Sequence, residues 1–542
     1  MDTTRTFASL ACLAALAAGA RSQLEFTELK GFTTGWQFGY TLAAAGDLDH
    51  DGTPDFLAAA LGSSAQGPFT GQVYRISGKT QAVLGWELGP SEGAYFGQAL
   101  AGGVDVNKDG WPEYLVGSPL EDRNGVPQAG GLRMYSGKTN QLWANWFGAN
   151  LNQMVGRSAG FAGDWNGDGW QDVIFGSPGG HSQGMATGWV RIASGSNSGT
   201  LATFYGQTDG ELFGYQACVI GDWDGDTIPD IAASAPSFKV NGVGVGRVDV
   251  LSGADGSTLD SWTGIDAPGQ FGYSLARIGD VNGDGREDLA IGAPAALKPG
   301  RVFVKLAGSG IEWFQLIGQD PTEMLGASVA RTSDIDKDGV ADLIAGGEHS
   351  SDGGHARVYS GATGQVLWST MQAQNPGDHF GCAVIEVGDV DGDGWTELAV
   401  GASGNDTNGT DSGAVRMVTA AVGQPDLGYG GPGNVQLEIY GQPLATGGKA
   451  DLRVTGAHAG QPAFLLASAF QQPVAFKGGT IVPQVATALM FELATDLTGG
   501  ITLTGIPGGK GPVDVYVQIL VLDANQPKGV AFSNAVRAEF LP

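Results

Sequence analysis

The stretch Asp280-Val281-Asn282-Gly283-Asp284-Gly285-Arg286-Glu287-Asp288 carries oxygen-bearing side chains at its first, third, fifth and ninth positions, with glycine at the sixth. Six further stretches have oxygen-bearing side chains at the same four positions, and all but the one starting at residue 222 also have the glycine. They start at residues 47, 105, 164, 222, 334 and 389, so that successive copies lie 54 to 59 residues apart. Nine residues before each start, an apolar residue is followed by glycine, as in Phe271-Gly272. Self-similarity at a near-constant period predicts that residues 24–420 are built from one repeated unit.

Each repeat has the pattern of a small antiparallel sheet. In the fifth repeat, four short apolar segments at residues 271–279, 288–294, 300–306 and 311–316 are separated by glycine, proline or the acidic loop. Such segments predict strands, and no stretch between them has a helical period. We therefore expect an all-β fold with seven four-stranded sheets around an axis, a seven-bladed β-propeller. An open solenoid is the alternative.

The two ends of the repeat region predict how the ring closes. Residues 24–29 resemble a strand without a blade, whereas the seventh repeat has no convincing fourth strand after residues 413–418. We expect residues 24–29 to complete the seventh blade, because closure removes the sheet edges that a linear array would expose.

Residues 1–20 have the features of a secretory signal peptide. Arg5 supplies a positive charge, residues 7–18 are apolar, and Ala18-Gly19-Ala20 is a small-residue cleavage site. The apolar run is too short to cross a bilayer, and no other stretch is long enough. We therefore expect a secreted or cell-envelope (cell-surface) protein without a membrane span. Of the three cysteines, Cys218 and Cys382 would remain, and we expect two buried free thiols and no disulfide.

The composition changes after the repeats. We assign the propeller to residues 21–423, and residues 424–433 form a linker rich in glycine and proline. Short apolar segments at residues 435–439, 451–454, 463–470, 501–503, 513–522 and 535–540 predict a smaller β-sandwich-like domain over residues 434–542.

The net charge of −28 is concentrated in the acidic loops. Their ligand positions hold 25 of the 56 acidic residues, so seven divalent cations would offset half of the excess charge. With only 28 basic residues and no basic cluster, the chain is not expected to bind nucleic acid.

The acidic loop has the donor set of a calcium site. Side-chain oxygens at positions 1, 3, 5 and 9 and the carbonyl at position 7 are hard ligands on a flexible turn, which suits Ca²⁺ better than Mg²⁺ or Zn²⁺. We predict up to seven calcium ions, one in each loop. The predicted ligand residues are Asp47, Asp49, Asp51, Thr53, Asp55, Asp105, Asn107, Asp109, Trp111, Glu113, Asp164, Asn166, Asp168, Trp170, Asp172, Asp222, Asp224, Asp226, Ile228, Asp230, Asp280, Asn282, Asp284, Arg286, Asp288, Asp334, Asp336, Asp338, Val340, Asp342, Asp389, Asp391, Asp393, Trp395 and Glu397.

A single loop of this kind could also be an EF-hand or a polar turn. An EF-hand requires glutamate at position 12, where loops one and five have Ala58 and Ile291 within predicted strands. A polar turn held by Asx bonds explains one loop but not seven in register. Thr227 stands where the other loops have the position-6 glycine, and we expect this turn to be strained or its site to be weaker.

The order of these elements resembles the FG-GAP repeat of the N-terminal β-propeller of integrin α-subunits. The resemblance rests on the Phe-Gly step, the acidic loop and Ile291-Gly292-Ala293-Pro294, with matching segments at residues 116–119 and 175–178; residues 345–348 depart from it. It implies a calcium-binding propeller over residues 24–420 and does not identify a partner. Integrins carry calcium in only some blades, whereas all seven loops here have the ligand pattern.

Alternating strand directions put the acidic loops and the second–third strand connections on opposite faces of a propeller. The longest of these connections are residues 120–130, 178–188, 236–246, 347–355 and 403–413. Variable loops on a rigid scaffold commonly bind ligands. We expect a protein or carbohydrate ligand on the face opposite the calcium loops, although any one loop residue is more commonly only solvated. The candidate contacts are Phe69, Glu121, Asp122, Arg123, His181, Phe238 and His355.

Two groups of side chains have alternative interpretations. Tryptophans at loop positions 2 and 7 suit carbohydrate stacking or, more commonly for repeated aromatics, packing between blades. They are Trp111, Trp165, Trp170, Trp223 and Trp395. A second group would form either a small metal cluster or, more commonly, a polar loop. It comprises Glu348, His349, Asp352 and His355.

The sequence favours an exported calcium-binding propeller that acts in binding, adhesion or cell-envelope interaction. The alternatives are an extracellular hydrolase or lyase acting on polysaccharide or phosphoester, and a purely structural envelope component. Catalysis is less favoured, because no G-x-S-x-G motif occurs and the serine-containing segment at residues 409–413 has no suitable partners.

Overall fold

The computed structural model describes residues 27–420, apart from 183, 266–267, 297, 309–310, 337 and 393–394, together with nine strands between residues 436 and 540. The predicted signal peptide and linker lie outside the described residues. Contacts divide the chain into two units, of which the first comprises Phe26–Gly392 and Thr396–Ala420. In the described part of the chain, every regular element is a strand, and no helix could cross a membrane.

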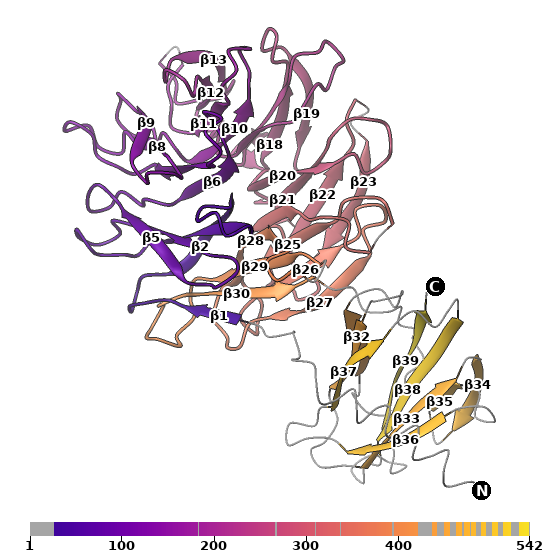
Figure 1. The fold of residues 1–542 in the computed structure, drawn as a ribbon. Coiled ribbons are helices and arrows are strands. Elements are labelled where there is room, and N and C mark those ends of the chain that lie inside the picture. Colours follow the sequence, from indigo (N-terminus) through magenta and orange to yellow (C-terminus); the bar gives the residue numbers. More distant parts are fainter. Residues whose placement is uncertain are drawn as a thin grey trace, which may run out of the picture. The chain divides into compact units, whose positions relative to one another are not determined.

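Seven four-stranded antiparallel sheets surround a central axis in the first unit, which is therefore a seven-bladed propeller (Figure 1). The strands of blades one to four are β2 (Phe38–Gly46), β3 (Asp55–Ala60), β4 (Gln72–Ile76) and β5 (Val83–Leu88); β6 (Ala99–Val104), β7 (Glu113–Ser118), β8 (Gly131–Tyr135) and β9 (Leu142–Phe147); β10 (Ser158–Gly163), β11 (Asp172–Ser177), β12 (Trp189–Ala193) and β13 (Thr200–Tyr205); and β14 (Ala217–Val219), β15 (Ile231–Ala235), β18 (Arg247–Leu251) and β19 (Thr258–Thr263). The short strands β16 (Lys239–Val240) and β17 (Val243–Gly244) form an extra hairpin in blade four.

The strands of blades five to seven follow the same order. They are β20 (Ser274–Gly279), β21 (Asp288–Ala293), β22 (Arg301–Lys305) and β23 (Glu312–Ile317); β24 (Ser328–Arg331), β25 (Leu343–Gly347), β26 (His355–Tyr359) and β27 (Val366–Gln372); and β28 (Phe380–Gly388), β29 (Glu397–Ala402) and β30 (Ala414–Thr419), with β1 (Thr27–Lys30) as the outer strand of blade seven.

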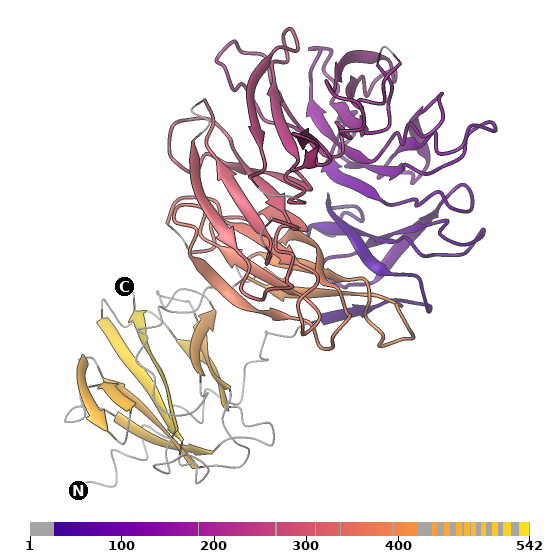
Figure 2. The same ribbon diagram turned by 180° about the vertical axis from the view of Figure 1, so that it is seen from behind.

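The N-terminal strand closes the ring, as the sequence predicts. β1 pairs antiparallel with β30, with Leu29 opposite Val415, so that the first and last strands of the propeller share one sheet. Both views show β1 and β30 side by side (Figures 1 and 2). The predicted segment began at residue 24, and residues 24–26 lie outside the described part.

The Phe-Gly steps join neighbouring blades. In the fifth repeat the first strand was expected from Phe271, but it begins at Ser274 because Phe271 pairs with Gly246 of the preceding blade and Gly272 has a φ of +88°. A side chain at Gly272 would place its Cβ 2.7 Å from that of Ser234, so only glycine fits. The apolar residue of the step is at most 2% exposed in all seven repeats.

The hydrophobic core lies between blades. One cluster combines Phe38 and Phe56 of blade one with Ala399 and Val415 of blade seven, and similar clusters join each successive pair of blades from one to six. Because each sheet buries both faces against its neighbours, the second strands are fully buried, as in β21. This packing holds the loops at the strand ends in fixed positions.

Cys218 and Cys382 are free thiols in blades four and seven, as expected, although both residues are half-buried and not fully buried. Burial raises the pKa of each thiol to about 12. Both therefore stay protonated at neutral pH.

The C-terminal unit is also built of antiparallel strands, as expected. Its sheets have the orders β31-β32-β37, β36-β33-β38-β39 and β34-β35. The strands are β31 (Gln436–Gly441), β32 (Lys449–Thr455), β33 (Pro462–Ser468), β34 (Gln471–Phe476), β35 (Gly479–Pro483), β36 (Leu489–Ala494), β37 (Ile501–Pro507), β38 (Val513–Val521) and β39 (Ala531–Phe540). The sequence did not predict β34, β35 and β36.

Candidate metal loops and the opposite face

Every acidic loop connects the first and second strands of a blade. In blade one the loop runs from the end of β2 to the start of β3, next to the turn between β4 and β5. The Gly78 N–H in that turn donates to Asp55 Oδ1 at 3.0 Å, and Lys79 Nζ lies 3.7 Å from Asp51 Oδ2. The first–second and third–fourth connections therefore share one face, as expected.

The position-9 carboxylate is the buried anchor of each loop. Asp55 Oδ2 accepts the N–H of Leu48, the position-2 residue, at 2.6 Å, and its side chain is fully buried. The other six loops repeat this bond at 2.6 to 2.9 Å. In five loops the second oxygen also accepts an N–H from the third–fourth turn, at 2.8 to 3.1 Å. This carboxylate thus ties two connections together.

Backbone N–H groups orient the remaining acidic side chains. In loop five, Asp280 Oδ1 and Oδ2 accept the N–H groups of Asp284 at 3.0 Å and Gly285 at 2.6 Å. Asp284 Oδ1 accepts the N–H of Arg286, at position 7, at 2.9 Å. The bond between Asp284 and Arg286 is an Asx turn, so a polar turn is part of the loop's own structure and helps to order the carboxylates.

Three carboxylates converge in four of the loops. In loop one, Asp47, Asp49 and Asp55, at positions 1, 3 and 9, each bring an oxygen within 4.8 Å of the others. Loops four, six and seven contain the equivalent group. Loops two, three and five have asparagine at position 3, which leaves one carboxylate fewer. The position-5 aspartate is not in these groups, and Asp393 of loop seven lies outside the described residues.

The raised pKa values of the position-9 carboxyls indicate that their ionised form is unfavourable in the folded loop. Burial, together with a smaller contribution from neighbouring loop carboxylates, raises the pKa of Asp55, Asp288 and Asp342 to about 6 and that of Glu113 to about 7. Clustered carboxylates of this kind repel one another unless a cation lies between them. The all-oxygen donor set fits a hard divalent cation.

Thr227 adopts the backbone conformation that glycine has in the other loops. Its φ is +76°, and the equivalent Gly52, Gly110 and Gly285 have values of +87° to +89°. A β-branched residue is a genuine outlier in this region. Loop four is therefore strained, as expected, although it keeps the same hydrogen-bond pattern.

The loop tryptophans pack against neighbouring parts of the propeller. Trp111 stacks on His50 of the preceding blade with ring centroids 3.5 Å apart, and Trp170 lies 6.0 Å from Trp143. Trp223 is 3% exposed. These contacts favour the packing interpretation over carbohydrate stacking.

The opposite face requires a correction to one predicted ligand contact, Glu121. Glu121 is 3% exposed and pairs with Arg133 at 2.8 Å, so it is a structural ion pair. Phe238 lies beneath Arg247, at 4.3 Å, and His355 Nε2 lies 3.1 Å from Asp352 Oδ1. The sequence could not reveal these pairings, because each partner lies elsewhere on the adjoining strand or loop. Nothing in the local sequence around either residue indicates that the two will meet.

The remaining candidates are more accessible. Phe69 is 43% exposed and stacks on Tyr95 with centroids 5.3 Å apart. Asp122 and His181 are exposed, and the half-buried Arg123 lies 3.5 Å over the ring of Phe147. These residues all lie in second–third connections of blades one to three.

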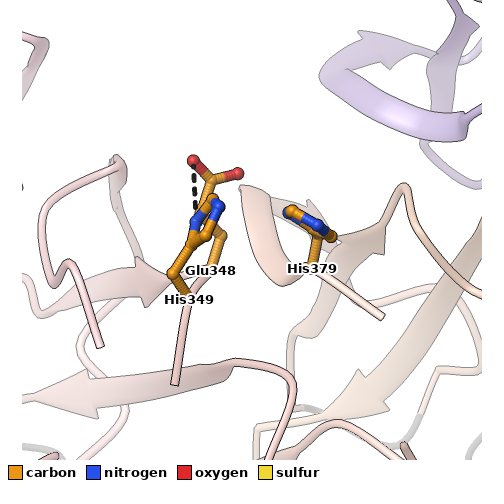
Figure 3. A group of neighbouring side chains, drawn as sticks. All are labelled: Glu348, His349 and His379. Atoms are coloured by element: carbon orange, nitrogen blue, oxygen red, sulfur yellow. Dashed lines mark ion pairs between the residues drawn. The ribbon is translucent and has the colours of Figure 1, made fainter. Parts of the chain in front are cut away.

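The predicted group of Glu348, His349, Asp352 and His355 separates into two sets. Asp352 pairs with His355, whereas Glu348 and His349 lie near His379 of blade seven (Figure 3). Sequence reasoning missed His379, which is 30 residues beyond His349. The signal that could have found it is its position directly before the Phe380-Gly381 step. Every blade has an equivalent residue there, so the position of His379 within its blade could be predicted.

Comparison with known proteins supports the repeat assignment. Residues 38–74, 271–304 and 384–416 match the FG-GAP repeat model, and residues 164–233 match that of an FG-GAP-like repeat. Integrin alpha-5 of Xenopus laevis is 30% identical over 37% of this chain and 20% of its own length. Integrin alpha-V of Gallus gallus is 31% identical over 37% of this chain and 21% of its own length. Integrin alpha-PS2 of Drosophila melanogaster is 34% identical over 30% of this chain and 12% of its own length.

This chain thus spans about a fifth or less of the length of these relatives. The repeat region is an integrin-α-like FG-GAP β-propeller.

Proposed function

We propose that this protein is an extracellular or cell-surface adhesion-type protein, a calcium-stabilised propeller that binds a protein ligand. The observation that carries the proposal is the division between the two faces. One face holds the seven acidic loops. The other holds dissimilar connections with exposed side chains, which are longer than the acidic loops in blades one, two, three and seven. The similarity to integrin α-subunits supports a role in binding.

Calcium would act on the first face as a structural ion. The predicted ligand residues bring carboxylates together at positions 1, 3 and 9, and the position-9 oxygens already fix the neighbouring turn. An ion bound to such a loop would neutralise the cluster and couple the loop to the third–fourth turn. Its expected role is therefore stability of the blade.

The protein ligand would bind the second face. Phe69 supplies an exposed aromatic surface on blade one, and Asp122 and His181 supply exposed polar side chains on blades two and three. Aromatic anchors within a polar rim are typical of protein interfaces. The connection that carries Asp122 is held by the buried ion pair of Glu121 with Arg133, which fixes this loop before a ligand binds.

The calcium part of the proposal is tested by calorimetry. Adding millimolar Ca²⁺ to metal-free protein should raise the melting temperature, and titration should give affinities in the range of roughly 10⁻⁴ to 10⁻³ M that extracellular calcium modules show. Identical melting curves with chelator and with calcium would contradict it.

The ligand part needs a separate test. The chain is screened in calcium against arrayed proteins and arrayed glycans, and the strongest protein hit is measured by surface plasmon resonance. Phe69→Ala and His181→Ala should weaken this binding without changing the melting temperature. Asp284→Ala, on the calcium face, is the matched control and should lower stability first. A hit on glycans alone, or normal binding by the face variants, would refute the assignment.

A further inference from the structure

Three potential metal ligands meet between blades six and seven, away from the acidic loops. Glu348 and His349 follow the end of β25, and His379 immediately precedes β28. Each offers one ligand atom, and these atoms lie within 4.8 Å of one another. His349 Nδ1 is 3.6 Å from Glu348 Oε1, and the two imidazole rings have centroids 4.6 Å apart at 85° (Figure 3).

The repeat itself shows that the scaffold does not need these side chains. Glu348 is the sixth residue after the position-9 acid of its loop, and His349 is the seventh. At the place of Glu348 the other blades have Leu61, Pro119, Pro178, Pro236, Pro294 and Ser403. At the place of His349 they have Gly62, Leu120, Gly179, Ser237, Ala295 and Gly404. Glutamate and histidine at these positions are therefore particular to blade six.

The same comparison applies to His379. Its φ is +53°, and the residues before the other six Phe-Gly steps also have positive φ. Those residues are Gln37, Tyr95, Met154, Leu212, Gln270 and Met324. The backbone shape thus belongs to the repeat, whereas the imidazole belongs to this blade alone. Three independent departures from the repeat pattern converge at one point.

The surroundings of Glu348 favour a bound cation. Its side chain is 20% exposed, and among the ion pairs of the described residues its partner is His349, with no lysine or arginine at this carboxylate. Glu348 also lines a cavity of about 220 Å³ formed by the first strands of the blades, together with Arg157 and Tyr273.

We propose that Glu348, His349 and His379 bind a divalent transition-metal ion of the Zn²⁺ class. Imidazole nitrogens suit Zn²⁺, Cu²⁺ and Ni²⁺, whereas Ca²⁺ takes oxygen ligands. Two histidines and one glutamate are the ligand set of open zinc sites, in which the remaining position holds water or a donor atom of a ligand. The site lies on the same face as the second–third connections, so that donor could belong to a bound molecule. The proposal does not depend on the calcium loops.

Co²⁺ titration of the untagged full chain provides the test, because Co²⁺ gives visible absorption bands that report its ligands. The experiment is done at pH 7.5 in several millimolar Ca²⁺, which occupies oxygen-only sites. One equivalent of Co²⁺ should bind and be displaced by Zn²⁺. His349→Ala and His379→Ala should each weaken binding at least about tenfold, the loss that even an outer-shell partner causes.

His355→Ala is the matched control, since it removes a histidine of the same face that lies outside the cluster. It should bind Co²⁺ as the unmodified chain does. Melting temperatures in calcium verify that each variant is folded, and Glu348→Gln tests the carboxylate with little change of shape. Absence of stoichiometric Co²⁺ binding, or unchanged affinity in both His349→Ala and His379→Ala, would overturn the proposal without affecting the calcium assignment.

Discussion

Thr227 donates its backbone N–H to Asp222 Oδ2 at 2.9 Å, the same bond that Gly52 makes to Asp47 in loop one. Thr227 does so at a φ of +76°, where its β-branched side chain is sterically disfavoured. The loop therefore keeps its hydrogen bonds at the expense of backbone strain.

Replacing Thr227 with glycine should relieve this strain. A non-glycine residue in the left-handed region costs roughly 1–2 kcal/mol, part of which the greater freedom of glycine in the unfolded chain cancels. We expect Thr227→Gly to raise the unfolding free energy by up to about 1 kcal/mol, measured by calorimetry in calcium. The reciprocal Gly285→Thr in loop five should lower it. A loss of stability in Thr227→Gly, or a gain in Gly285→Thr, would refute the strain argument.

The position-9 and position-5 acids should differ in their dependence on calcium. Asp288→Ala leaves the buried N–H groups of Val281 and Ala307 without their acceptor, at about 1–3 kcal/mol for each unpaired group. We expect Asp288→Ala to destabilise the propeller with or without calcium. Asp284→Ala should lower the stability of the propeller mainly when calcium is present. Melting curves of both variants in calcium and in chelator distinguish the two roles. If calcium changes the destabilisation by the same amount in Asp288→Ala and Asp284→Ala, this distinction is wrong.

The stability of the calcium-free protein should fall as the pH rises. Folding raises the pKa of Asp55 and Asp288 from 3.8 to about 6. The folded state therefore binds these protons more tightly than the unfolded state, and the resulting stability is present below pH 4 and lost as the pH rises through about 6. Metal-free protein should melt at a higher temperature at pH 5 than at pH 7.5. Millimolar calcium should flatten this dependence, and a metal-free melting temperature that rises from pH 5 to 7.5 would contradict the prediction.

Removal of β1 should open the seventh blade. A chain lacking residues 1–30 loses the strand that pairs with β30 and exposes its edge, whereas a chain lacking residues 1–20 keeps it. The shorter chain should melt at a lower temperature and aggregate, as followed by light scattering. Equal stability of the two chains would show that closure does not require this strand.

The fold could be predicted because its signals are local and repeated. Each blade carries its own Phe-Gly step and acidic loop within fewer than sixty residues, so seven copies support one assignment. The strand starts were less accurate. Phe271 was assigned to a first strand, but it pairs with the preceding blade, and a single repeat contains no information on that neighbour.

The candidate sites were predicted only where their residues lie within one loop. Positions 1, 3 and 9 could be read from the motif, whereas Glu121 was mistaken for a ligand contact because its ion pair with Arg133 forms only in the folded sheet. His379 was missed for the same reason, since its neighbours belong to another blade.

The pairing of Leu29 with Val415 spans 386 residues, although every other blade is assembled from strands that are close together in the sequence. The ribosome therefore makes the first strand of the ring long before its partner exists. Six blades can form in order of synthesis from local contacts, which are fast, but the ring cannot close until β30 is available. The final encounter of the chain's two ends is the step that converts a row of blades into a propeller, and its rate sets how long an open seventh sheet is exposed to other chains.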